Sequence, residues 1–207
     1  MRGLLKNDFL AVYTNAKVFS VFMFLFGIFC AAVTSQSLQM YYIVIGTVGF
    51  SMNTVAVLNN EYSSKWGKYK LTLPIKRADI VKSQFLNHLL WLLIGILFVG
   101  IELCLSWLLH GFPFEQSIDM LSVFALGISI SLFMGAIFIP LFYLGGAEKS
   151  TVFLIISVLC AIGIDAVLVN ITDASFLFGI VMMLVCSSLT FALSYPITVR
   201  IFRKREY

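Results

Sequence analysis

Long apolar stretches separated by short polar connections make up most of the chain. A helix needs about 20 mostly apolar residues to cross the hydrocarbon core of a bilayer. Six stretches have this character, at residues 18–34, 40–58, 85–109, 120–144, 151–170 and 176–199. The pattern therefore predicts an all-α integral membrane protein, with six transmembrane helices in a single transmembrane domain over residues 1–207.

The segment before the first span, residues 1–17, follows a different pattern. Its apolar positions share one helical stripe, formed by Leu5, Phe9, Val12, Tyr13 and Ala16. Its polar and charged positions lie elsewhere, at Arg2, Lys6, Asp8, Asn15 and Lys17. This distribution is typical of an amphipathic helix in the headgroup region of a bilayer. We therefore expect an amphipathic helix in the headgroup region here, either as a general anchor or with a mechanical role.

The composition agrees with lipid as the solvent of this chain. Hydrophobic residues make up 60% of its 207 residues and charged residues 12%, whereas soluble domains carry about 25% charged residues. A domain of this size keeps too much surface exposed to hide such a surplus of apolar side chains from water. The composition therefore excludes a soluble globular domain.

The basic residues predict the orientation in the membrane. All 14 Lys and Arg residues fall before the first span, in the second-to-third or fourth-to-fifth connection, or in the tail at 200–207. The connections 35–39, 110–119 and 171–175 contain none. Because basic residues concentrate on the cytoplasmic side, both termini are predicted to be cytoplasmic. Anionic membrane lipids account for the net charge of +4, so no nucleic acid partner is expected.

The largest polar segment is the cytoplasmic loop at residues 59–83. Tyr62, Trp66, Tyr69 and Leu73 are spaced for one face of a helix, and Pro74 then ends or bends it. An aromatic face of this kind either lies on the bilayer interface or docks into a groove of another protein. The spacing alone leaves both interpretations open.

The sequence lacks the common motifs for catalysis and nucleotide binding. It contains no P-loop, no dinucleotide-binding glycine motif and no H-E-x-x-H zinc motif. Its two histidines, His88 and His110, sit at opposite ends of one predicted span. We therefore expect no enzyme activity in this chain, and neither a metal nor a cofactor bound to it.

Two features inside the spans are candidates for function. Glu102 and Asp165 are ionisable residues within the membrane, where such groups are costly and often functional. They either line a substrate pathway or extend to the nearby outer interface. In the fourth span, Gly127, Ser131 and Gly135 recur at every fourth position, which allows helices to approach closely. This packing seam lies either within the chain or between subunits.

The loop and its flanks resemble a pattern of permease subunits of type-two ABC exporters. In that family an acidic residue ends the second span, and a stretch of the form L-P-[IV]-x-R-x-x-[IV]-V leads into the third. Here the acidic residue is Glu61, and the stretch is Leu73 to Val81 with Arg77 at its centre. The chain looks closest to small bacterial members of the bacitracin-resistance and phenol-soluble-modulin exporter type.

The resemblance implies that the 59–83 loop contains a coupling helix, which docks on a cytoplasmic ABC ATPase subunit. The docking residues carried over from the family's pattern are Glu61, Lys65, Trp66, Tyr69, Leu73 and Pro74. Residues 1–17 correspond to the family's connecting helix. ATP and Mg²⁺ would be bound by the ATPase, a separate chain. The resemblance also implies a dimer, with a second copy or a sister permease, in a bacterial plasma membrane.

The expected function is therefore that of the permease subunit of an ATP-driven exporter, which moves an amphipathic peptide, an antibiotic or a lipid-like compound by alternating access. The alternative is a non-transporting assembly or regulatory protein that docks a cytoplasmic partner through residues 59–83. The direction of transport rests on the resemblance, and the sequence identifies no substrate. Larger relatives carry re-entrant helices or a domain between the last two spans, and residues 171–175 leave no room for either.

Overall fold

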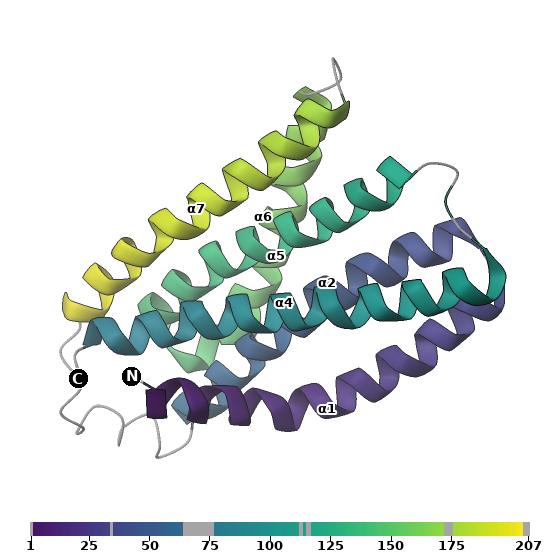
Figure 1. Ribbon diagram of the computed structural model, residues 1–207. Helices are drawn as coiled ribbons and strands as arrows, with labels where there is room; N and C mark the ends of the chain where they lie inside the picture. Colours follow the sequence, from purple (N-terminus) through teal and green to yellow (C-terminus); the bar gives the residue numbers. More distant parts are fainter. Residues whose placement is uncertain are drawn as a thin grey trace.

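The computed structural model describes residues 2–33, 35–63, 77–111, 114, 117–171 and 176–204. In these ranges the chain is helical apart from short connections, and it has no strand. The helices are α1 (Arg2–Val33), α2 (Gln36–Ser63), α4 (Arg77–His110), α5 (Ser117–Gly145), the 3₁₀ helix η1 (Ala147–Lys149), α6 (Ser150–Ile171) and α7 (Phe176–Lys204) (Figure 1). The prediction of an all-α fold is confirmed for this part of the chain.

Five helices, namely α1, α4, α5, α6 and α7, are long and apolar enough to cross a membrane within the described ranges. Each coincides with one predicted span, and most extend beyond it. The remaining predicted span, residues 40–58, lies inside α2, which does not meet the same criterion in its described part. The polar residues of α2 include Thr47, Ser51 and Thr54, which are buried against other helices.

Helix α5 is the central helix of the bundle. It packs against α7, α6 and α2. Of the residues in its most apolar segment, 67% are buried, against 17% in the corresponding segments of α1 and α6. Helices α1, α2 and α4 pack on one another (Figure 1). The core accordingly has two clusters. One contains Phe133, Phe138 and Phe142 of α5, and the other contains Phe50 of α2 and Trp91 of α4.

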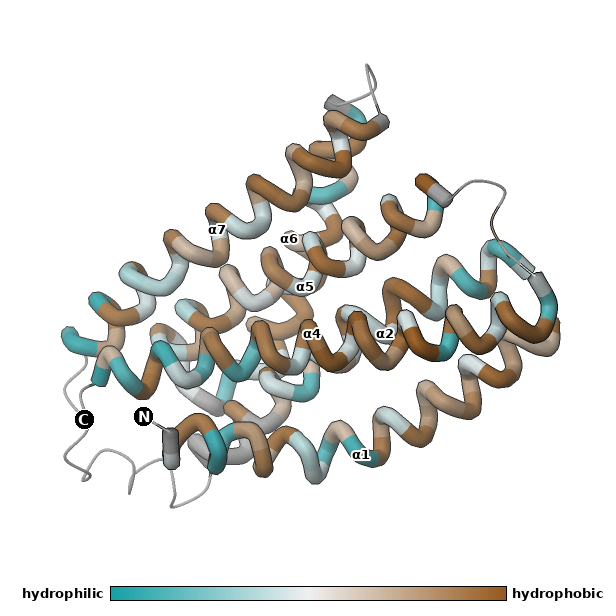
Figure 2. The backbone as a smooth tube through the Cα atoms, viewed as in Figure 1, coloured by the Kyte–Doolittle hydropathy of each residue, from teal (hydrophilic) through white to brown (hydrophobic). Residues whose placement is uncertain are grey.

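The outward faces of the peripheral helices are apolar. Large exposed side chains include Phe22 and Leu25 on α1, Leu159 on α6 and Leu193 on α7. Figure 2 shows hydrophobic positions in brown along these helices, with hydrophilic positions in teal near the end where the two termini lie. Contiguous apolar surface of this kind is rare on soluble proteins. It suits hydrocarbon, in which each helix satisfies its own backbone hydrogen bonds.

Helix α1 runs without interruption from Arg2 to Val33, so residues 2–17 and the span expected at 18–34 form one continuous helix. The position of residues 2–17 in the headgroup region stays a prediction. The stripe that the first half of α1 buries consists of Leu4, Asp8, Val12 and Ala16. Tyr13, placed on the apolar stripe by the sequence pattern, is 52% exposed. The buried face of this segment is therefore turned toward the neighbouring helices.

Most of the predicted stripe does face inward, because Val12 and Ala16 are buried and the Phe9 ring stacks on Trp91 of α4. The sequence pattern missed one buried member of this face, Asp8. Its side chain is 1% exposed, and its Oδ2 accepts a hydrogen bond of 2.8 Å from the hydroxyl of Ser83 on α4. Gln84 Nε2 lies 3.5 Å from the same oxygen. A carboxylate can be buried where a neighbouring helix supplies donors. The pattern of one helix does not reveal the donors on another.

The start of α4 is bound to the end of α7. Arg77, the first residue of α4, donates from Nη1 to the backbone carbonyls of Phe202 at 3.1 Å and Arg203 at 3.3 Å. Its guanidinium also lies 5.7 Å from the centre of the Phe202 ring. The last carbonyls of a helix lack partners within it and attract a cation. This contact joins two long helices at the end of the bundle where both termini lie (Figure 1).

Candidate functional site

The predicted docking loop starts and finishes at the end of the bundle that carries the termini. Helix α2 ends at Ser63 and α4 begins at Arg77 (Figure 1). Glu61 lies in the last turn of α2. The other docking residues, Lys65, Trp66, Tyr69, Leu73 and Pro74, lie outside the described residues. Docking on a partner therefore stays a prediction.

Hydrogen bonds from α4 join it to α1 and to α7 at this end of the bundle. Arg77 binds the last carbonyls of α7, and Ser83, less than two turns further along, donates to Asp8 of α1. Both contacts involve charge-assisted hydrogen bonds, which are stronger than bonds between neutral groups. The start of α4 is therefore hydrogen-bonded to both α1 and α7.

A buried polar layer around His88 joins α2, α4 and α5. His88 is 1% exposed. Its Nε2 lies 3.1 Å from the carbonyl oxygen of Ser131, and its Nδ1 lies 3.1 Å from the hydroxyl of Thr54. The Ser131 hydroxyl in turn donates to the hydroxyl of Ser51 at 2.7 Å. Because the carbonyl can only accept, Nε2 carries a hydrogen, and His88 bridges the helices on both sides of α4.

The seam of small residues on α5 faces other helices of the same chain. A methyl group at Gly127 would collide with the Thr47 hydroxyl on α2. A methyl group at Gly135 would lie 2.7 Å from Nε2 of His88 and 3.0 Å from the ring of Phe191 on α7. Ser131, between them, reaches Ser51 of α2. The three positions thus place α5 close to α2, α4 and α7.

Glu102 lies in the half of α4 that is remote from the termini, where α1 and α2 cover it. Both carboxyl oxygens are buried, and neither has a hydrogen-bond partner among the described residues. Gly27 of α1 permits this close approach, because a methyl group there would collide with Oε2 and lie 3.1 Å from the hydroxyl oxygen of Tyr42. The carboxyl group therefore points into the bundle.

Asp165 lies on α6 and faces α5. It is 3% exposed, and its Oδ1 accepts a hydrogen bond of 2.6 Å from the hydroxyl of Ser129. Its Oδ2 has no partner in the described part of the chain. Glu102 and Asp165 contact different helices, so a single chain does not bring these two predicted pathway residues together in one site.

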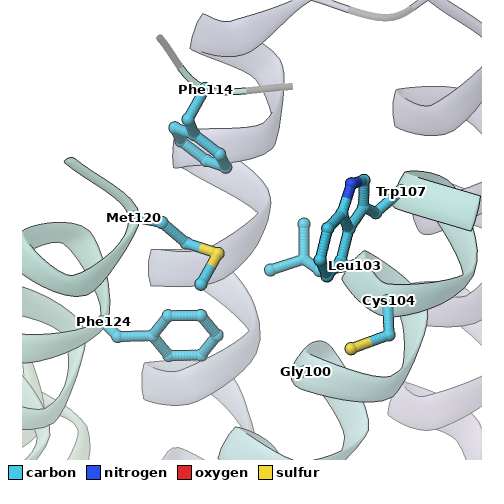
Figure 3. Close-up of a pocket in the computed structure, with 7 residues that line it drawn as sticks. All are labelled: Gly100, Leu103, Cys104, Trp107, Phe114, Met120 and Phe124. Carbon is cyan, nitrogen blue, oxygen red and sulfur yellow. The ribbon is translucent and has the colours of Figure 1, made fainter. Parts of the chain in front are cut away.

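An apolar groove runs between α4 and α5 at the end of the bundle away from the termini. Its inner pocket has a volume of about 170 Å³. The lining residues are Gly100, Leu103, Cys104, Trp107, Phe114, Met120 and Phe124 (Figure 3). A wider groove of about 640 Å³ continues from it along the same helices. The side chains of α4 and α5 face each other across this space, which suits an acyl chain or another apolar group.

Two of these contacts were not predicted from the sequence, namely the Asp8–Ser83 bond and the bridge made by His88. Asp8 had a signal, because it lies between Leu4 and Val12 on a stripe spaced by four residues that is otherwise apolar. A polar residue in such a position marks a contact between helices. The partners of His88 come from two other helices, so no local spacing identifies them.

One comparison with known proteins identifies a family for this chain. Residues 3–203 match the family described as ABC-2 family transporter protein. No significant match is found among curated proteins, nor among solved structures. The family match extends from α1 to α7 and so covers the whole helical bundle. The chain therefore belongs to the ABC-2 transporter family, as a multi-pass membrane protein that forms the permease component of an ABC transporter and works with an ATPase partner.

Proposed function

We propose that this permease exports an amphipathic peptide, an antibiotic or a lipid-like compound from a bacterial cell, in the manner of the bacitracin-resistance and phenol-soluble-modulin exporters. A cytoplasmic ATPase that binds ATP and Mg²⁺ supplies the energy, and this chain has no catalytic site of its own. The observation that carries the proposal is the family match over residues 3–203. The apolar groove between α4 and α5 supports a cargo with a large apolar part.

In this proposal the chain crosses the plasma membrane six times and has both termini in the cytoplasm. Helix α2 provides the sixth crossing, because its 28 residues extend about 42 Å and the hydrocarbon core is about 30 Å thick. It packs against α1, α4 and α5, which shield its polar side chains from lipid. An even number of crossings also agrees with termini at one end of the bundle (Figure 1).

The 59–83 loop is proposed to receive the movement of the ATPase. Its carboxyl end continues into α4, where Arg77 is bound to α7 and Ser83 to α1. A displacement of the loop would therefore act on three membrane helices at once. Alternating access requires two packings of the helices that ATP binding biases. The same cycle requires a second permease, identical or related, to complete the pathway.

Co-purification with the ATPase tests this proposal. We expect Trp66→Ala combined with Leu73→Asp to abolish the complex and ATP-dependent efflux. The matched control is Phe178→Ala combined with Leu177→Asp, because Phe178 and Leu177 are 62% and 64% exposed at the start of α7, away from the docking loop and from the apolar groove. The control protein should keep the ATPase. Retention of both complex and efflux in the first variant would contradict the proposal.

A different outcome would favour the regulatory alternative. If the chain binds its partner through residues 59–83 but vesicles containing the complex move no amphiphile when ATP is supplied, the chain docks a partner without transporting. The assay therefore measures binding and transport on the same preparation, with the two double variants side by side.

A further inference from the structure

The carboxyl group of Glu102 is enclosed without the partners that a charged group needs. Both of its oxygens are buried and accept no hydrogen bond from any described residue. The Tyr42 hydroxyl on α2 is in the same condition, because its ring is 2% exposed and its oxygen is buried without a partner in the described part of the chain. Two unsatisfied polar groups thus lie inside the apolar cluster of α1, α2 and α4.

These two groups approach the same point on α1. The position that a methyl group would occupy at Gly27 lies 2.9 Å from the carboxyl carbon of Glu102 and 3.1 Å from the hydroxyl oxygen of Tyr42. The backbone of α1 therefore covers both groups directly. This close cover is possible only because residue 27 has no side chain.

The surroundings of Glu102 disfavour its ionised form. Taking an ion out of water costs several kcal/mol unless opposite charges and hydrogen bonds compensate, and a buried group normally neutralises instead. Two titratable groups face Glu102. One is the thiol of Cys30 on α1, which is close enough to interact electrostatically with the carboxyl group, and the other is the phenol of Tyr42 on α2. Neither can carry a positive charge.

One proton resolves the unsatisfied groups together. A protonated carboxyl has one O–H donor and keeps acceptor capacity, and a tyrosine hydroxyl both donates and accepts. The two groups can then satisfy each other with a small adjustment of side chains. We propose that Glu102 and Tyr42 form a proton-binding site, with the α1 backbone at Gly27 as its cover, which holds a proton while α1 is packed on α2 and α4 and releases it when α1 moves away.

The position of the site agrees with release toward the end remote from the termini. Glu102 precedes the end of α4 at His110 by eight residues, a rise of about 12 Å. The cover is an outer helix of the bundle, because only 17% of the residues in the most apolar segment of α1 are buried, against 33% for α4. Separation of α1 would therefore admit water to the carboxyl. The inference concerns the packing of this chain and holds whether or not the chain exports its proposed cargo.

Carbodiimide labelling of the full chain in lipid vesicles tests the site. A carbodiimide reacts with a protonated carboxyl by adding its O–H across one C=N bond, and the adduct rearranges to a stable N-acylurea without a leaving group. We expect dicyclohexylcarbodiimide, which partitions into lipid, to modify Glu102 at neutral pH, as read by peptide mass spectrometry. The labelling rate should fall about tenfold per pH unit once the proton is lost.

The controls separate this site from an ordinary carboxylate. Glu102→Gln should abolish labelling of that peptide. A charged, water-soluble carbodiimide should modify the exposed Glu148 and spare Glu102. Gly27→Ala, which displaces the carboxyl from its cover, should make Glu102 accessible to the water-soluble reagent, whereas Gly163→Ala, with open space around it, should not.

Two results would overturn the proposal. One is a folded protein in which dicyclohexylcarbodiimide leaves Glu102 unmodified across the pH range. The other is labelling of Glu102 by the water-soluble reagent as fast as that of Glu148, which would show an open and ionised carboxylate. Size-exclusion chromatography of each variant establishes that the protein labelled is folded.

Discussion

His88 is the residue through which α4 holds both α2 and α5. Its two ring nitrogens lie 3.1 Å from Thr54 and 3.1 Å from Ser131, and the ring of Phe191 on α7 stacks on it at 5.6 Å. Inside an apolar bundle no water is available to the ring nitrogens, so these contacts supply the hydrogen-bond partners that the buried imidazole needs. A side chain of this size also fills space that neighbours cannot readily occupy.

His88→Ala is expected to lower the free energy of unfolding by about 3 kcal/mol, because the variant loses two hydrogen bonds and leaves a cavity. Thermal and denaturant unfolding in detergent measure the loss. The matched control is His110→Ala, since His110 is exposed at the end of the same helix, and it should change stability by less than about 0.5 kcal/mol. Equal stabilities of the two variants would contradict this role.

The glycines of the bundle differ in how much space surrounds them. Gly127 faces Thr47 so closely that even a methyl group would collide with it, whereas Gly163 on α6 has nothing within 4 Å of the same position. Gly127→Val should therefore destabilise the bundle by about 2 kcal/mol through overpacking. Gly163→Val, which points into open space, should be close to neutral. Unfolding midpoints of the two variants provide the comparison, and a neutral Gly127→Val would show that α2 can move aside.

At the scale of the helices, Asp8 links the first half of α1 to α4. The hydrogen bond from Ser83 joins α1 to α4 on the face where Leu4, Val12 and Ala16 are buried. The carboxylate thus contributes to holding this face against α4.

Asp8→Ala is expected to cost about 1–3 kcal/mol, because the donors on α4 lose their acceptor in a buried position. Asp8→Asn keeps one acceptor oxygen and should recover part of the loss. Asn7→Ala, at an exposed neighbouring position, serves as the control. The stability of each protein in detergent gives the order wild type, Asn, Ala, and any other order would contradict this role of Asp8.

The elements were largely predictable because crossing a bilayer imposes length and apolar composition. The limits of α5 and α6 agree with the predicted spans to within a few residues. The partners of the buried Asp8 were not predictable, because they are donors of α4 that lie far away in sequence. Likewise, Glu102 was recognisable as an ionisable residue within the membrane, but its cover by Gly27 depends on how two helices pack.

At the scale of the whole molecule, the contacts made at the start of α4 link the proposed docking loop to the rest of the bundle. Arg77 belongs to the motif on which the family resemblance rests, and in the structure it makes a contact between helices. It binds the last carbonyls of α7, the final helix of the chain. Without this bond, α4 would contact α7 through ring packing such as that of Phe85 with Phe191 and Tyr195.

Arg77→Ala should therefore uncouple transport from the ATPase without releasing it. Coupling free energies between sites are typically 1–3 kcal/mol, so we expect ATP-driven efflux to fall about tenfold while co-purification of the ATPase is unchanged. Arg200→Ala is the matched control, because Arg200 lies on α7 near the same end and is exposed. It should leave efflux at the wild-type level.

The two measurements on Arg77→Ala distinguish coupling from docking. Loss of the ATPase together with efflux would mean that Arg77 shapes the docking loop itself, since the variant would then behave like the Trp66 and Leu73 double variant. Unchanged efflux would mean that α7 follows α4 through apolar packing alone. Arg77→Lys sharpens the comparison, because a single ammonium keeps the charge at the end of α7 but lacks the fork of donors that a guanidinium offers. If charge at the helix terminus suffices, Lys restores efflux. If the two-carbonyl contact is needed to hold α7 in register with α4, it does not.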